Sequence, residues 1–260
     1  MEVILTKDFS SIKETLQCRF QTYKQKSAFT LAEVLITLGI IGVVAAMTLP
    51  TLVANYRKKV IVTQVKKFYT VMSQATNIAI AENGPMDGWD GFTSAHNGEE
   101  MQHWFDKYLK PNLKVLDEWI EIDEDTHSET FFAQLADGGI VAMTNWAASV
   151  QDKDETTGVD NNHTVDDYNG LIHVVYLTNK KALKKEERKQ CVNVFSFLFY
   201  SPLKKQYFFQ PYTYQANTQA QYNREFFKNQ ISSGNGQYCA ALMMMDGWEI
   251  KDDYPYSYKY

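Results

Sequence analysis

The chain has 260 residues, a formal net charge of -5 at pH 7 and 45% hydrophobic residues. This length suits one domain, or one domain with an appendage. The mean hydropathy of -0.37 excludes a protein with many membrane spans. The acidic balance argues against nucleic acid as a partner, because nucleic-acid binding needs a basic surface.

One long apolar run lies near the N-terminus, from Phe29 to Leu49, and Glu33 is its only charged residue. As a helix this run of about 21 residues measures about 31 Å, which is enough for one membrane crossing. It is too long for the apolar region of a secretory signal peptide, which has roughly 7–15 residues. A plain membrane anchor is the alternative. Because an acid inside a span is costly, however, Glu33 points to a function.

The letters AFTLAE, residues 28–33, resemble the processing site of type IV prepilins and type II secretion pseudopilins. In that bacterial family a basic leader ends in a small residue, usually Gly. A prepilin peptidase then cuts before an aromatic residue and methylates the new N-terminus. The resemblance implies a leader peptide of residues 1–28, cleavage between Ala28 and Phe29, and N-methylation of Phe29. Ala28 departs from the usual Gly, and the leader is long for the commonest pilin class.

Two further positions match the family when residues are counted from Phe29. Glu33 is the fifth residue and Pro50 is the twenty-second. The resemblance implies that, in a filament, Glu33 of one subunit neutralises the Phe29 amine of a neighbour. Pairing offsets much of the cost of burying either charge alone, so the pair would fix how subunits align more than it would add stability.

The resemblance also implies the partners and the location. The partners would be other copies or other pilin-like subunits, the prepilin peptidase and methyltransferase, an inner-membrane assembly platform and membrane lipid. Before assembly the protein would cross the inner (cytoplasmic) membrane once, with its C-terminal domain outside the cytoplasm. It would then enter a pilus or pseudopilus. Basic residues flank the apolar run on both sides, so charge alone does not fix the orientation.

Beyond Pro50 the apolar residues continue at steps of three and four, which predicts an amphipathic helix. Asn83, Gly84 and Pro85 predict its end. We therefore expect one helix over residues 29–81, with 29–49 in the membrane or the filament core. Pro50 removes a backbone donor and should kink or locally open this helix. The face expected to pack on the C-terminal sheet consists of Ile61, Val65, Phe68, Met72, Ala75 and Ala79.

Residues 82–260 are expected to form one globular α+β domain of the pilin type, with the long helix packed on an antiparallel sheet. Apolar spacing predicts a helix over 98–109 and a second over 217–230. The segment 130–146 predicts a hairpin with its turn at 136–139. Further strands are expected over 171–178, 191–200 and 205–212.

Of the three cysteines, Cys18 falls in the leader, while Cys191 and Cys239 fall in the globular domain. Outside the cytoplasm an even pair favours a disulfide, and pilins often carry a C-terminal bridge. A bridge would stabilise the fold by about 4 kcal/mol in the chain-entropy model. The alternative is two unpaired buried thiols.

No cofactor is expected except a weakly supported calcium ion. The segment 152–170 is rich in oxygen ligands, although their spacing does not match an EF-hand loop. Some pseudopilins bind calcium in C-terminal loops. The candidate ligands are Asp152, Asp154, Asp160, Asp166 and Asp167, and a polar loop without metal is the alternative.

No catalytic motif is present, and the five histidines show no metal-ligand spacing, so we expect no enzyme. The acidic stretch 117–125 and the basic stretch 180–189 are expected to be solvated charged segments. The first hypothesis is a structural filament subunit of a type IV pilus or a type II secretion pseudopilus. The alternative is a minor tip pilin that binds a surface, a secreted protein or DNA, since the chain left after cleavage is large for a major subunit.

Overall fold

The computed structural model describes residues 29–146, 171–201 and 203–256 of the chain, which divides into two compact units, Met1–Leu49 and Pro50–Tyr260. Helix α2 (Leu31–Asn83) contributes residues to both units. It begins and ends two residues later than the predicted helix and runs through Pro50. The predicted stop signal of Asn83, Gly84 and Pro85 is confirmed, because the helix ends at Asn83 and Gly84 follows with a φ of 82°.

The predicted apolar face of α2 is confirmed within the second unit. Every member of the stripe is buried, and Thr76 is buried beside them. Thr76 can lie in the core because its hydroxyl donates to the carbonyl of Met72 at 2.7 Å. The spacing of three and four therefore places one side of this part of α2 against the domain core.

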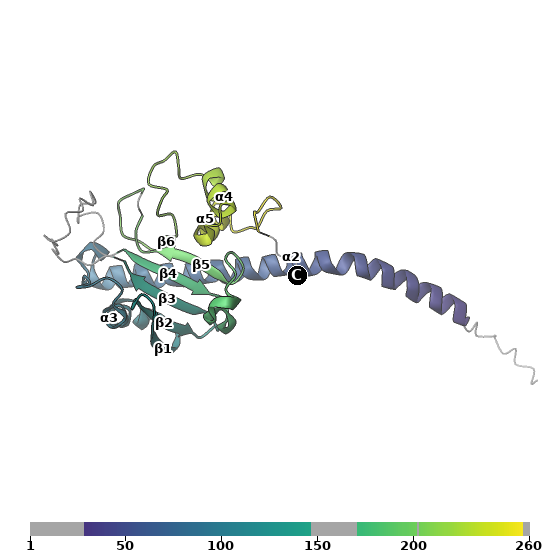
Figure 1. The fold of residues 1–260 in the computed structure, drawn as a ribbon, viewed down its shortest axis with the longest axis horizontal. Helices are drawn as coiled ribbons and strands as arrows, with labels where there is room; N and C mark the ends of the chain where they lie inside the picture. Colours follow the sequence, from purple (N-terminus) through teal and green to yellow (C-terminus); the bar gives the residue numbers. More distant parts are fainter. Residues whose placement is uncertain (1–28, 147–170, 202, 257–260) are drawn as a thin grey trace, which may run out of the picture. The chain divides into compact units, whose positions relative to one another are not determined.

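A six-stranded antiparallel sheet forms the centre of the second unit, and its strand order follows the chain order (Figure 1). Each strand pairs with the next, so successive strands are joined by hairpins or longer connections on the same sheet. The strands are β1 (Val115–Ile122), β2 (Glu129–Leu135), β3 (Ile140–Asn145), β4 (Ile172–Leu177), β5 (Val194–Leu198) and β6 (Gln210–Pro211).

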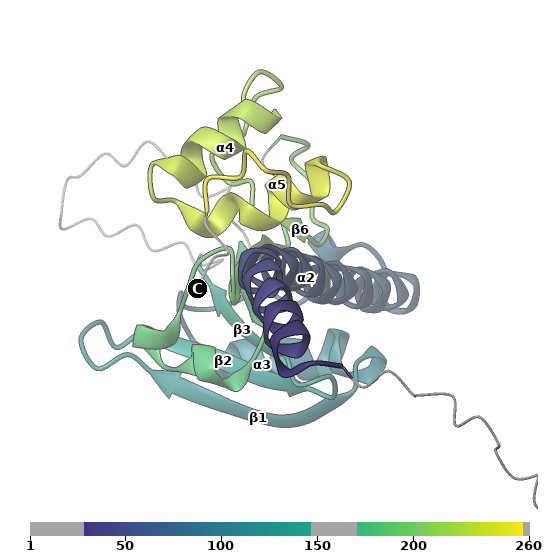
Figure 2. The ribbon, with the colours of Figure 1, turned by 90° about the vertical axis from the view of Figure 1, so that its right-hand side faces the viewer.

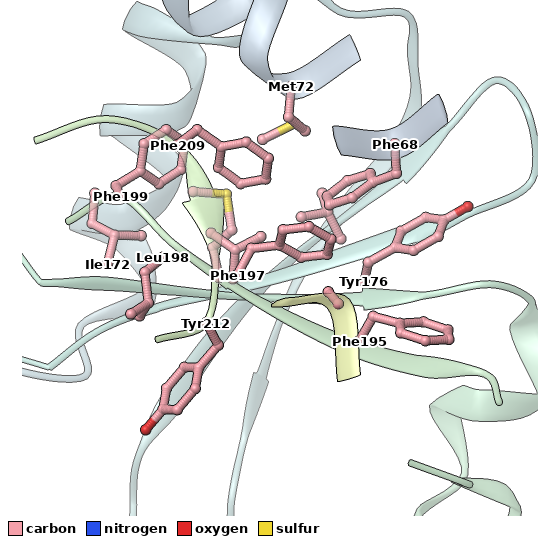
Figure 3. Packing of buried hydrophobic residues seen from close by; sticks show 14 of the residues in the cluster. Phe68, Met72, Ile172, Tyr176, Phe195, Phe197, Leu198, Phe199, Phe209 and Tyr212 are labelled. Carbon is pink, nitrogen blue, oxygen red and sulfur yellow. The ribbon is translucent and has the colours of Figure 1, made fainter. Parts of the chain in front are cut away.

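The inner face of the sheet packs against α2 and against helix α3 (Gly98–Tyr108). Phe68 of α2 stacks on Tyr176 of β4 with ring centroids 4.1 Å apart. Figure 3 shows Phe68 and Met72 pointing from α2 toward the aromatic residues of the sheet. Phe105 of α3 contacts Phe131 of β2, with ring centroids 5.0 Å apart. Large aromatic side chains thus fill the space between the helices and the sheet.

The outer face of the sheet has a smaller apolar cluster of its own. Successive side chains of a strand point to opposite faces of the sheet, so the residues next to the inward-facing ones point to this outer face. The cluster is partly covered by residues 178–193, which include the short 3-10 helices η4 (Lys180–Leu183) and η5 (Lys185–Glu187). Its buried members are Phe132, Ile140, Ala142, Leu177, Ala182 and Val194.

Two short helices form the C-terminal part of the second unit. Helices α4 (Arg224–Ser232) and α5 (Cys239–Met245) lie side by side (Figure 2). A disulfide joins Cys239, the first residue of α5, to Cys191, with a Cα–Cα distance of 5.3 Å. The disulfide therefore ties this helical part to the segment that enters β5.

Three further elements complete the described fold. The 3-10 helix η1 (Met86–Gly88) follows α2, and η2 (Lys110–Asn112) follows α3. The third, η6 (Gly236–Tyr238), precedes α5. The α+β fold with a long N-terminal helix packed on an antiparallel sheet is confirmed, as are the helix near 98–109, the hairpin of β2 and β3, and the strands β4 and β5.

The expected strand over 205–212 is largely wrong. Only Gln210 and Pro211 form strand pairs with β5, and the Tyr212 N–H donates to the Ser196 carbonyl directly after them at 3.0 Å. Lys205 has a φ of 52°, a left-handed conformation that interrupts an extended strand.

The predicted helix over 217–230 starts too early. Asn223 has extended backbone angles, and its side chain accepts the N–H of Phe226, so it caps a helix that begins at Arg224. The residues before Asn223 form turns instead, as in the hydrogen bond from the Tyr222 N–H to the Thr218 carbonyl.

Two elements were missed by the sequence analysis. The acidic stretch 117–125 was expected to be only a solvated face, yet most of it belongs to the edge strand β1. Trp119 and Ile120 pair with β2, while Asp117 and Glu121 on the same strand are exposed. Helix α5 was also missed, because seven residues are too few for a clear helical periodicity.

Candidate processing and assembly segment

The first turn of α2 contains reciprocal hydrogen bonds between Thr30 and Glu33. The Thr30 N–H donates to the Glu33 carboxylate at 2.8 Å, and the Thr30 hydroxyl donates to the same oxygen at 2.9 Å. In return, the Glu33 N–H donates to the Thr30 hydroxyl oxygen at 3.2 Å. This arrangement is a capping box, which satisfies backbone donors that the first helical turn leaves unpaired.

The capping box was not found from the sequence, although its signal is present there. A Thr followed three residues later by Glu at the start of an apolar run is the known pattern. Glu33 therefore has a structural role in the helix as well as the assembly role that the resemblance implies. The two roles are compatible, because a carboxylate has two oxygens and can accept from more than one donor.

Phe29 precedes the capping box directly, and its side chain is 84% exposed. Cleavage before Phe29 would create an α-amine one residue away from Thr30, whose N–H already points to Glu33. The Glu33 carboxylate therefore lies at the end of the helix where the new amine would form. Ala28, the other residue of the expected cleavage site, lies outside the described residues.

The first part of α2 presents an apolar surface on all sides. Its two hydroxyls donate within the helix, from Thr37 to the Val34 carbonyl at 3.0 Å and from Thr48 to the Val44 carbonyl at 2.9 Å. Polar groups are thus satisfied without water, as a membrane requires. The helix α2 is long and apolar enough to cross a membrane. Exposed members include Leu31, Leu35, Ile36, Leu38, Ile40, Ile41, Val43, Met47 and Leu49.

Small residues interrupt this apolar surface at Gly39 and Gly42. A Cβ added at either glycine would meet no other atom within 4 Å. Such positions let a second helix approach the backbone closely in a membrane or an apolar bundle. Pro50 follows at the end of the run and removes the N–H that would donate to the Ala46 carbonyl.

The other predicted site residues belong elsewhere in the chain. The five aspartates considered for calcium, Asp152, Asp154, Asp160, Asp166 and Asp167, all lie outside the described residues. Within the described ranges, no group of three or more His, Cys, Asp or Glu side chains is arranged to hold a metal ion. Cys191 and Cys239 lie in the second unit and are paired in the disulfide.

The basic stretch 180–189 is partly engaged in the fold. The Arg188 guanidinium donates to the carbonyls of Ala182 and Leu183, at 3.0 and 3.3 Å. Lys185 forms an ion pair with Asp123 at 2.9 Å, and their hydrogen bond lowers the pKa of Asp123 to about 2. The Arg188 hydrogen bonds lie within residues 178–193, and the ion pair joins these residues to the turn after β1.

Together the N-terminal segment and the fold support a precursor that is like a type IV pilin or pseudopilin. Residues 23–49 match the prokaryotic N-terminal methylation motif, the prepilin-type cleavage and methylation signal. With the apolar helix, this motif fits a membrane-anchored precursor.

The remainder of the chain identifies the family. Residues 51–258 match the model described as "Family of unknown function (DUF6613)", and the chain belongs to this family. Comparisons with curated proteins and with solved structures gave no match.

Proposed function

We propose that the protein is a structural subunit of a type IV pilus or a type II secretion pseudopilus. The prepilin peptidase cuts before Phe29, the new N-terminus is methylated, and the subunit then assembles through its apolar helix. The observation that carries this proposal is the position of Glu33, the fifth residue from Phe29, within the matched methylation motif.

The energetic argument concerns two charges in an apolar surrounding. A carboxylate and an amine that are each buried alone in a helical bundle cost several kcal/mol, and a direct pair offsets much of that cost. The capping box supports this proposal, because it holds the Glu33 carboxylate at the end of the helix where the amine forms. Assembly would therefore favour one alignment of neighbouring helices, the one that brings Glu33 to a Phe29 amine.

The proposed topology follows from the same segment. Before assembly the apolar run crosses the inner membrane once, with the leader in the cytoplasm and the second unit outside it. The disulfide of Cys191 and Cys239 supports this side for the second unit, because disulfides persist in oxidising compartments. The partners in this proposal are other pilin-like subunits, the peptidase and the assembly platform.

N-terminal sequencing tests the proposal directly. The protein is purified from cells with and without the prepilin peptidase. We expect a methylated Phe29 terminus in the first case and the uncut leader in the second. An intact Met1 terminus in both strains would overturn the proposal.

A minor subunit at the filament tip is the second candidate, in which the second unit binds a ligand. A cavity of about 430 Å³ on the outer face of the sheet, lined by residues of β2, β3 and β4, favours it. Immunogold labelling separates the two roles, since a major subunit is labelled along the fibre and a tip subunit only at its end.

A further inference from the structure

An uncharged stretch of α2 is bounded by Glu33 at one end and Arg57 at the other. It contains about 23 residues, 34–56, and as a helix at about 1.5 Å per residue it measures at most about 35 Å. A bend at Pro50 would only shorten this distance. The hydrocarbon core of a bilayer is about 30 Å thick, and the bilayer with its headgroups is about 40–45 Å thick. Given the membrane crossing of the proposed function, on which this inference rests, Arg57 therefore falls at the level of the headgroups.

Three consecutive cations, Arg57, Lys58 and Lys59, follow this stretch directly and are called the basic collar below. The next acidic residue of the helix is Glu82, so no carboxylate of α2 offsets their charge nearby. Lys58 is half-buried and pairs with the exposed Asp252 at 3.3 Å, whereas Arg57 and Lys59 are exposed. Arg57 and Lys59 therefore present positive charge at the surface of the helix.

One side of the helix changes from apolar to charged as it approaches the collar. Leu52, Tyr56 and Lys59 follow each other at steps of four and three, so they lie on the same side. Leu52 is 66% exposed and Tyr56 is 68% exposed, so the domain core does not use this side. The order of an aliphatic residue, a tyrosine and a cation matches the order of hydrocarbon, interface and headgroups in a bilayer.

The direction of helical side chains brings these cations closer to the membrane. Every Cα–Cβ bond of a helix tilts toward the helix N-terminus, and the apolar run of α2 lies at that end. The long stems of Arg57 and Lys59 can therefore lie along the helix and carry their cations back toward the membrane surface. The acceptors in the headgroup layer are phosphate oxygens, with which guanidinium and ammonium groups form charge-assisted hydrogen bonds.

We propose that the basic collar binds the phosphate groups of anionic phospholipids, in the leaflet through which α2 leaves the membrane. Leu52 and Tyr56 contact the acyl chains and the interface, and Arg57 and Lys59 contact the headgroups. Lipid is the partner rather than a soluble anion, because the collar continues directly from the apolar run. The collar thus fixes the depth of the subunit in the membrane before assembly.

The test measures which lipids the full chain prefers in phosphatidylcholine vesicles. Trace amounts of spin-labelled phosphatidylglycerol or phosphatidylcholine report, by electron paramagnetic resonance, the share of lipid whose motion the protein restricts. We expect an association constant at least about twofold higher for phosphatidylglycerol, because cations near a membrane surface attract anionic lipid. This preference should fall as salt shortens the Debye length from about 10 Å at 0.1 M to about 3 Å at 1 M.

Three double variants locate the preference on the collar. Arg57→Gln with Lys59→Gln should remove at least about half of it, because both exposed cations are lost. Arg57→Lys with Lys59→Arg keeps both charges and should keep the preference. Lys180→Gln with Lys181→Gln removes the same charge from exposed positions in η4 and should leave the preference unchanged.

The collar and the membrane crossing fail in different ways. Restricted phosphatidylcholine shows that the helix lies in the bilayer, so its absence would overturn the crossing and the collar together. Equal restriction of the two lipids, or an unchanged preference in Arg57→Gln with Lys59→Gln, would overturn the collar alone. If that variant kept its lipid preference but gave little filament, the collar would instead contact a neighbouring subunit.

Discussion

The Glu33 carboxylate accepts hydrogen bonds from both the N–H and the hydroxyl of Thr30, at 2.8 and 2.9 Å. Thr30 is the second residue after the expected cleavage between Ala28 and Phe29. The presence of this acidic side chain thus has two explanations: it caps the helix, and it is the charge partner in assembly. A cap needs only a hydrogen-bond acceptor, whereas assembly by charge pairing needs the negative charge.

Substitution of Glu33 separates these explanations. Glu33→Gln keeps a side chain that suits a capping box, and Glu33→Ala removes both the cap and the charge. We expect both variants to be cleaved normally and both to give little filament, because both lack the charge. Processing is measured by N-terminal sequencing and assembly by the yield of sheared filaments. Wild-type filament yield from Glu33→Gln would leave only the capping role.

Phe68 is expected to be a major contact between α2 and the sheet, because it is 1% exposed and stacks on Tyr176. Phe68→Ala should lower the free energy of unfolding by about 3–5 kcal/mol through lost burial and a cavity. Thermal unfolding of the full chain in detergent, followed by circular dichroism, measures the change. Ile78→Ala is the control on the same helix, where the side chain is 45% exposed and the effect should be small. Equal effects of the two substitutions would contradict this packing.

The disulfide gives a chemical prediction. Cys191 and Cys239 should resist a thiol-reactive maleimide in the denatured, unreduced mature protein, and should react after reduction. Replacing both by serine should cost about 4 kcal/mol of stability, because the bridge restricts the unfolded chain. Mass spectrometry of the labelled protein counts the free thiols. Two labelled cysteines without reduction would instead support unpaired buried thiols.

Arg224 links α4 to the C-terminal segment through its planar guanidinium. Its Nε and Nη2 donate to the buried Asp246 at 2.7 and 3.0 Å, and its Nη1 donates to Asp253 at 2.8 Å. These hydrogen bonds hold the pKa of Asp253 well below its usual range. Lysine cannot reproduce the paired geometry, so Arg224→Lys should destabilise the protein by about 1.5–3 kcal/mol.

Asp252→Asn is the matched control for Arg224. Asp252 pairs with Lys58 at 3.3 Å, but its side chain is fully exposed. Exposed pairs contribute roughly 0–1 kcal/mol, so this variant should melt close to the wild type. Chemical denaturation compares both variants. If Arg224→Lys were as mild as Asp252→Asn, the C-terminal segment would not depend on the guanidinium.

His173 makes stability depend on pH. Its ring is buried between Trp146 and Tyr212, and its Nε2 has no hydrogen-bond partner within the described residues. Burial lowers the pKa of His173 from 6.5 to about 4. Between these values the unfolded chain binds more protons than the folded one, so stability falls as the pH falls through this range. The full effect is about 3 kcal/mol.

His173→Phe should remove this dependence, since phenylalanine fills the same apolar site without titrating. Melting temperatures are compared from pH 6.5 to pH 5, a window above the usual pKa values of most carboxylates. A wild-type slope no steeper than that of His173→Phe would show that protonation of this histidine does not govern the stability.

The sequence predicted local periodicity well and pairing poorly. The buried stripe of α2 and the turn between β2 and β3 depend on the spacing of apolar residues and on glycine, which are local properties. The edge strand β1 was hidden because its carboxylates broke the apolar alternation. The segment 205–212 showed a suitable composition, but Lys205 adopts a left-handed conformation that no composition reveals.

The sequence by itself determined the prepilin-type methylation motif and the membrane-length apolar run, because each is a local pattern of consecutive residues. Only the tertiary structure decided which distant groups meet, such as Phe68 with Tyr176, Cys191 with Cys239, and the acidic turn after β1 with the basic segment after β4. Such meetings depend on strand order and on the packing of side chains far apart in the chain. Many alternative pairings satisfy the same local preferences, and the packing of the whole core selects one of them.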